Sequence, residues 1–249
     1  MTSYKLAKYN VKSNLKPIII FYLIFITVIT SIVIINKTSG GGIRSSGIEF
    51  SSAIFLFVIG LNSFKENFYF SQANNISRED YFKSMAVTIL PVALGMSIID
   101  LVINRIYNVF VASPTIYDMA YGSSSYSFIN GETWTRSNSI QTLFGTVTFL
   151  FAFYIVVFAI GLLITMIYYK CNKTMKILVT LSPLLFQAIL GIILYNSPEF
   201  EGKYEVFIEN ILGINARNSY MAVVTFICLF IISMFFVYIL VRKAVVKRF

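Results

Sequence analysis

Residues 65–83, KENFYFSQANNISREDYFK, form a charged and aromatic segment between apolar runs at 50–64 and 84–99. We call this segment the island. A loop that only reverses the chain needs about 4–6 residues, so the island is long for a loop. Aromatic residues and arginine are enriched at protein contacts, and their mixture here predicts a surface that docks against another protein. A solvated loop with an interfacial aromatic anchor is the alternative. Ser77 followed by Asp80 predicts the start of a helix.

The composition is that of a membrane protein. Hydrophobic residues make up 57% of the 249, charged residues only 12%, and the mean hydropathy is +0.76, whereas soluble chains average about 25% charged residues. The net charge of +9 comes from basic residues that flank the apolar runs, which favours membrane topology over nucleic-acid binding.

Several catalytic chemistries are excluded by residue type. The chain has no histidine, which excludes Ser-His-Asp and Cys-His catalysis and histidine-ligated zinc. The glycine-rich segment 42–47 is followed by Ile48 and Glu49, where a phosphate-binding loop needs Lys and then Ser or Thr. We therefore expect no catalytic residue, metal site or cofactor in this chain, and no ATP bound by that route. The two cysteines imply no disulfide framework.

The order of apolar and polar segments predicts an all-α integral membrane protein with a single transmembrane domain over 1–249. Residues 1–16 have helical spacing of apolar residues and lysines, which predicts an amphipathic helix lying in the membrane interface. Residues 105–139 predict a loose external loop, and the acidic but apolar segment 196–217 predicts one or two short helices at the outer boundary. Six spans are predicted at 17–36, 48–64, 84–104, 140–168, 177–195 and 219–241.

Charge asymmetry gives the predicted orientation. With the N-terminus in the cytoplasm, the cytoplasmic segments hold fourteen of the 20 basic residues and only three of the 11 acidic ones. This is the distribution that the positive-inside rule requires. The prediction is therefore a multi-pass protein with both termini cytoplasmic.

The assembled layout resembles the permease subunits of six-helix ABC exporters. In that family an elbow helix precedes the first span, a cytoplasmic coupling helix lies between spans two and three, and short helices re-enter the outer leaflet between spans five and six. Here these elements correspond to 2–15, 65–83 and 196–217. The run Ile76–Lys83, ISREDYFK, is similar to the Ser-Arg-x-x-Tyr run that such permeases often carry. In size and character the chain is similar to the permeases of phenol-soluble-modulin exporters and of lantibiotic immunity in Gram-positive bacteria.

The resemblance implies partners and a site. A separate ABC ATPase subunit would bind ATP and Mg and receive the island in a cleft, and a second copy of this chain would complete a 2:2 complex in the bacterial plasma membrane. Pairing with a different permease is the alternative to the second copy. The substrate class implied is an amphipathic, membrane-active peptide. The ATPase-coupling residues would be Phe68, Tyr69, Ser77, Arg78, Glu79, Asp80 and Tyr81.

Few polar residues interrupt the predicted spans, and we expect those that do to line the substrate path: Glu49, Asn62, Asp100 and Gln187. An apolar lining with few polar groups suits an amphipathic peptide or a lipid-like molecule. Glu49 and Asp100 lie toward the same outer side and would meet cationic groups of a departing peptide. The alternative is local pairing with Arg44 and Arg105.

Two other functions stay open at this stage. An ion-driven secondary transporter is expected to carry polar or charged residues at mid-membrane and often an inverted repeat, and the sequence shows neither pattern. A non-transporting scaffold or immunity protein that sequesters its target is the other. A neighbouring ATPase gene would favour the exporter over both.

Overall fold

The computed structural model describes residues 2–40, 45–122 and 137–244, and the regular structure in these ranges is helical. The helices, in chain order, are α1 (Thr2–Thr38), α2 (Glu49–Asn62), α3 (Lys65–Ala73), α4 (Arg78–Tyr107), α5 (Ile116–Tyr121), α7 (Ile140–Lys170), α8 (Lys173–Asn196), α9 (Pro198–Leu212) and α10 (Ser219–Arg242). Five of them, α1, α4, α7, α8 and α10, are long and apolar enough to cross a membrane. The prediction of an all-α fold is confirmed for the described residues, and these five helices are compatible with a multi-pass membrane protein.

Two predicted boundaries are wrong. The interfacial helix expected at 1–16 is not a separate element, because α1 continues through Pro17 to Thr38. The second span, expected at 48–64, is only the 14-residue helix α2, about 21 Å long at 1.5 Å per residue. It ends where the backbone N–H of Ser63 bonds to the carbonyl of Gly60, and α3 begins two residues later.

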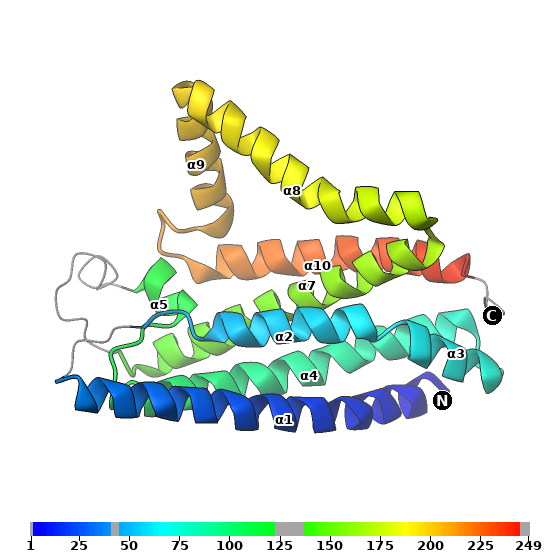
Figure 1. Ribbon diagram of the computed structural model, residues 1–249, viewed down its shortest axis with the longest axis horizontal. Helices are drawn as coiled ribbons and strands as arrows, with labels where there is room; N and C mark the ends of the chain where they lie inside the picture. The colour runs from blue at the N-terminus through cyan, green and yellow to red at the C-terminus, as the bar shows by residue number, and fades with distance from the viewer. Residues whose placement is uncertain (1, 41–44, 123–136, 245–249) are drawn as a thin grey trace.

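The core lies where α7 packs against α2, α4 and α10, with α1 packed against α4. Figure 1 shows these helices running lengthwise side by side. Gly60 of α2 and Gly161 of α7 lie at the closest approach of their two helices, because a Cβ on either would collide with backbone of the other helix. Small residues let helix backbones come this close inside membranes. Gly161 therefore has a packing role.

The first and last described helices start and finish at the same end of the bundle. α1 begins and α10 ends there, together with α3 and the turn between α7 and α8 (Figure 1). The opposite end carries α5 and the turn between α9 and α10. The island and most of the basic residues therefore share one end, as the charge asymmetry predicts.

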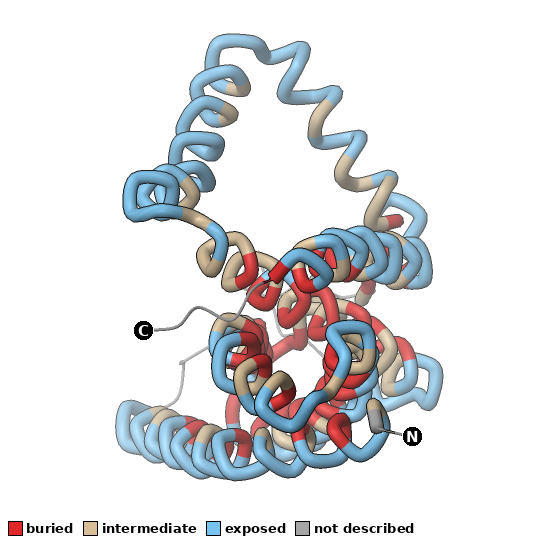
Figure 2. The backbone as a smooth tube through the Cα atoms, turned by 90° about the vertical axis from the view of Figure 1, so that its right-hand side faces the viewer, coloured by how far each residue is buried: buried red, intermediate tan, exposed pale blue. Residues whose placement is uncertain are grey.

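The helices α8 and α9 stand away from the rest. Neither contains a buried residue; α8 packs against α9, and α9 packs against both α8 and α10. Figure 2 shows them as an exposed arch above the buried centre. The segment 196–217 forms a single helix, α9, which starts at Pro198 and ends at Gly213 with a left-handed φ of 67°.

Candidate functional site

A buried polar cluster lies where α1, α2, α4 and α7 meet. At its centre the Asp100 carboxylate of α4 accepts hydrogen bonds from three hydroxyl groups. The Tyr22 hydroxyl donates at 2.9 Å, the Ser52 hydroxyl at 2.9 Å and the Tyr154 hydroxyl at 2.5 Å. We call Asp100, these three donors and Glu49 the Asp100 cluster. It joins four helices through one carboxylate.

Glu49, the first residue of α2, is fully buried, at 0% exposure. Among the described residues, neither of its carboxylate oxygens has a hydrogen-bond partner. The backbone N–H groups of Glu49 and Ile116 face the carboxylate, without the geometry of a hydrogen bond. The Tyr154 hydroxyl that bonds Asp100 also donates to the main-chain oxygen of Glu49, at 3.3 Å. Glu49 is therefore part of the cluster, but no hydrogen bond from the described residues stabilises a negative charge on its carboxylate.

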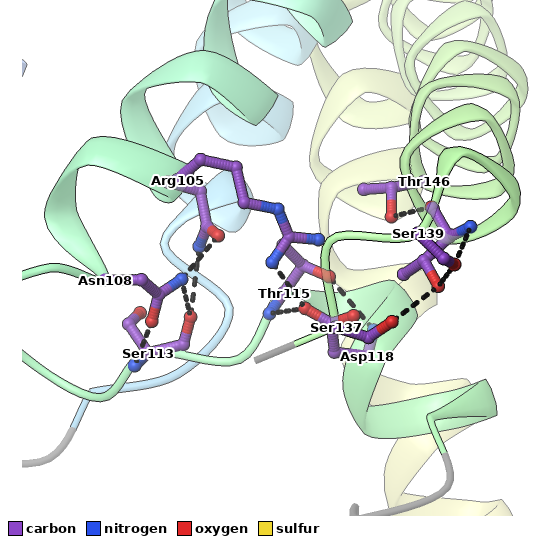
Figure 3. A network of polar contacts seen from close by, with 10 residues as sticks. Arg105, Asn108, Ser113, Thr115, Asp118, Ser137, Ser139 and Thr146 are labelled. Atoms are coloured by element: carbon purple, nitrogen blue, oxygen red, sulfur yellow. Dashed lines mark hydrogen bonds and ion pairs between the residues drawn. The ribbon is translucent and has the colours of Figure 1, made fainter. Parts of the chain in front are cut away.

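A third buried acid lies nearby and is paired. Asp118 of α5 accepts from Arg105 of α4 at 3.5 Å and from the backbone N–H of Thr115 at 3.2 Å, and Thr115 in return caps α5. Figure 3 shows the Arg105 guanidinium directed at Asp118. The expected alternative pairing of Asp100 with Arg105 is therefore wrong. Arg44, the expected partner of Glu49, lies outside the described residues.

The same end of the bundle has a second polar network. The Asn104 and Asn108 amides both donate to the Ser113 carbonyl, at 3.1 and 2.8 Å, while the Asn108 side-chain oxygen accepts from the Ser113 N–H. Figure 3 shows Asn108 and Ser113 facing each other. These bonds fix the turn after α4, which places α5 beside Glu49. The described part of the expected loose loop at 105–139 is therefore ordered by local hydrogen bonds.

Tyr121 extends this end toward α9. Its hydroxyl donates to the Leu212 carbonyl at 2.7 Å. Burial, with a smaller contribution from the neighbouring Tyr117, raises the pKa of Tyr121 to about 12. The hydroxyl therefore keeps its proton, and its bond to α9, at neutral pH.

The Asp100 cluster lies deep within the bundle. Tyr154 is near the middle of α7, and Tyr22 is near the middle of α1. Sequence reasoning did not predict this cluster, which side chains from four helices assemble. The expected substrate path is not assembled, however. Asn62 bonds to its own helix at the Val58 carbonyl, and Gln187 is exposed on α8, so only Glu49 and Asp100 come together.

Two aromatic residues of the island point into the core. Phe68 and Tyr81, two of the expected ATPase-coupling residues, are fully buried, which corrects their assignment to an exposed contact. Their ring centroids are 5.4 Å apart, and Phe64 packs 5.0 Å from Phe68 and 5.1 Å from Tyr169 of α7. The aromatic half of the island therefore fixes α3 onto α4 and α7.

The charged half of the island is exposed at the turn into α4. Ser77 caps α4, as predicted: its hydroxyl accepts from the Asp80 N–H at 3.0 Å and donates to the Asp80 carboxylate at 2.9 Å. Arg78 donates to the main-chain oxygen of Arg242, the last residue of α10, at 2.8 Å. Glu79 pairs with Lys83 at 2.6 Å. The remaining residue of the set, Tyr69, is half-buried, with its hydroxyl 3.4 Å from that of Tyr169.

Tyr22, Ser52 and Tyr154 were not identified from the sequence. Glu49 and Ser52 are three residues apart, so they share a helix face, and this spacing was the one available signal. The two tyrosines read as ordinary members of apolar runs. Among the described residues, no group of three or more His, Cys, Asp or Glu side chains is placed to hold a metal ion. The chain matches no protein-family model, no curated protein and no solved structure, so its function has to be argued from its own residues.

Proposed function

We propose that this chain is the membrane subunit of an ATP-driven exporter of amphipathic, membrane-active peptides, powered by a separate ABC ATPase. The observation that carries the proposal is the construction of the island. Its exposed turn, Ser77–Asp80, lies at the end of the bundle where α1 begins and α10 ends, and its buried aromatic residues fix it to the long helices.

This construction suits the transmission of force. A partner that pushes on the turn acts on the first residues of α4 directly and on α7 through the Phe64–Tyr169 contact. It also acts on α10 through the Arg78–Arg242 hydrogen bond. Closure of two ATPase subunits would therefore move these helices as rigid bodies.

The proposal also assigns a topology and partners to the rest of the chain. In the proposed topology α2 is the second of six crossings, and both termini are cytoplasmic, in a bacterial plasma membrane. The lysines at the start of α1 face anionic lipid headgroups. The partners are the ATPase, which binds ATP and Mg, and a second copy of this chain in a 2:2 complex.

Reversing the charge of Arg78 tests the proposal. The chain is co-expressed with the neighbouring ATPase, and the purified complex is reconstituted into vesicles. We expect native mass spectrometry to give a 2:2 assembly, and we expect amphipathic peptides to stimulate its ATP hydrolysis. Arg78→Glu should reduce peptide-stimulated hydrolysis to the basal rate and abolish peptide export.

Lys203→Glu is the matched control, since it reverses an exposed charge on α9, a helix that packs against α8 and α10 and not against the island, and should leave coupling intact. Melting temperatures of both variants check that the loss of the Arg78–Arg242 bond has not unfolded α10. A chain that purifies without the ATPase, or an Arg78→Glu complex that still exports peptide, would contradict the proposal.

A further inference from the structure

The charges inside the bundle do not balance among the described residues. Three acidic side chains are buried: Glu49, Asp100 and Asp118, at 0, 2 and 3% exposure. The ion pairs in the described ranges are Arg105–Asp118 and the exposed Lys83–Glu79. If both were ionised, the Glu49 and Asp100 carboxylates would therefore repel each other, because no basic side chain of the described residues lies at salt-bridge distance from either.

The two carboxylates are treated differently by their surroundings. Asp100 has three hydroxyl donors, which stabilise a negative charge at that position. Glu49 has none, and both of its oxygens are buried. Burying an ionised carboxylate without partners costs several kcal/mol or more, so such groups in proteins are paired, bind a cation or become neutral. Inside membranes they mark ion and proton pathways.

The groups around Glu49 are oxygen-rich. Tyr22 faces the cluster from α1, Ser52 from α2, Asp100 from α4, Asp118 from α5 and Tyr154 from α7. The main-chain oxygens of Glu49 and Met96 also lie at the cluster, each as an acceptor for one of the tyrosines. Hard cations prefer oxygen ligands of this kind.

We propose that Glu49 and Asp100 form a binding site for a single monovalent positive charge, supplied by a proton or by a small alkali cation. The site is independent of the proposed coupling to an ATPase, because it uses no residue of the island. Its occupant neutralises Glu49 beside the hydrogen-bonded Asp100 and so holds the start of α2 against α4 and α7. Loss of the occupant leaves two adjacent buried carboxylates, which drives the start of α2 away from α4.

Two measurements on the detergent-purified chain distinguish the two sources. The first is the melting temperature in sodium chloride against choline chloride at equal ionic strength, which keeps electrostatic screening constant. The second is the carboxylic-acid C=O band in infrared spectra. An alkali-cation site predicts a sodium-dependent rise in melting temperature that Glu49→Gln abolishes. A proton site predicts no sodium effect, together with a protonated-carboxyl band that Glu49→Gln removes.

Glu66→Gln is the matched control. Glu66 is also an acid in the first turn of a helix, α3, but it is exposed, so the variant should match the unaltered chain in both measurements. Asp100→Asn is the second variant, and it should shift the Glu49 carboxyl band or weaken the sodium effect. Both readouts exist in the unaltered chain, so they remain informative even where a variant folds poorly.

The proposal is overturned if the unaltered chain shows neither a sodium effect nor a protonated carboxyl band. Arg44→Gln tests for an internal partner. One combination of results would assign the positive charge to Arg44. In that case the infrared spectrum shows an ionised Glu49, sodium has no effect on the melting temperature, and Arg44→Gln destabilises the chain as much as Glu49→Gln does. No exchangeable cation would then be bound.

Discussion

The single hydroxyl proton of Tyr154 faces two acceptors. The hydroxyl donates to Asp100 at 2.5 Å and lies 3.3 Å from the main-chain oxygen of Glu49, and the side chain is fully buried. Hydrogen bonds to charged groups contribute about 1.5–3 kcal/mol each to stability, and a buried acceptor that loses its donor keeps its desolvation cost. Tyr154 is therefore the side chain on which α2, α4 and α7 jointly depend.

Removing this hydroxyl should destabilise the fold. Tyr154→Phe keeps the ring and its packing but leaves Asp100 one donor short, so we expect a loss of about 1.5–3 kcal/mol. Denaturant or thermal unfolding in detergent measures it. Tyr195→Phe on α8, where the side chain is 87% exposed, should change nothing. Equal stability of the two variants would mean that the Tyr154–Asp100 hydrogen bond makes no net contribution to the free energy of unfolding.

The sequence identified some of these residues and not others, for a physical reason. Ser77 and Asp80 are three residues apart, and their cap is a local interaction that the sequence can specify. Glu49 and Asp100 stand out because acids are rare in apolar runs. Tyr22 and Tyr154 are 78 and 54 residues from Asp100, and tyrosine in a membrane protein usually marks the lipid interface. Only the packing of the helices shows that these two bond a carboxylate.

Between helices, the closest contact is that of α2 with α7. Gly60 lies against the backbone at Phe158 and Leu162, and Gly161 lies against the backbone at Phe57 and Leu61. The hydroxyl of Thr165 also donates to the Leu61 carbonyl across the same interface. Backbone cannot move aside as a flexible side chain can, so neither position accepts a methyl group without separating the helices.

Alanine at these glycines should be costly, with Gly191 as the contrast. Gly60→Ala and Gly161→Ala should each destabilise by about 1–3 kcal/mol, the usual cost of overpacking. Gly191→Ala on α8 meets no atom within 4 Å and should stabilise its helix by up to about 1 kcal/mol. Melting temperatures of the three variants measure the contrast. A Gly161→Ala variant as stable as the unaltered chain would show that α2 and α7 can move apart freely.

Helix boundaries were less predictable than the helices themselves. The long runs at 84–104, 140–168 and 219–241 each fall within one helix, because twenty or more apolar residues favour that structure alone. The boundary expected at Pro17 does not exist, because a proline removes one backbone hydrogen bond without forbidding the helix. The end of α2 depends on contacts between Phe64 and residues of α3, α4 and α7, which no local pattern reveals.

At the scale of the molecule, the positions of the first and last described helices bear on the proposed topology. α1 begins and α10 ends at the same end of the bundle, although α2 is shorter than the other long helices (Figure 1). The distribution of lysine and arginine then predicts which end faces the cytoplasm. This orientation can be measured without a partner protein or a substrate.

Cysteine labelling in intact cells tests the orientation. Cys171 ends α7 at the end that holds the island, and Cys228 is replaced by serine to leave it as the single thiol. We expect a membrane-impermeant maleimide to label Cys171 only after the cells are lysed. In a chain without native cysteines, Ser197→Cys at the exposed turn between α8 and α9 should react in intact cells. The reverse pattern would invert the proposed topology.

The shared position of the start of α1 and the end of α10 has a consequence for protein engineering. In the proposed topology, a genetic fusion can join the end of one copy to the start of another, or to an ATPase, by a linker that stays on one side of the bilayer. Such a tandem polypeptide needs no extra transmembrane helix in its linker for both copies to have the same orientation in the membrane. It would also permit a variant such as Glu49→Gln in one half only, which separates the contribution of each copy within a pair.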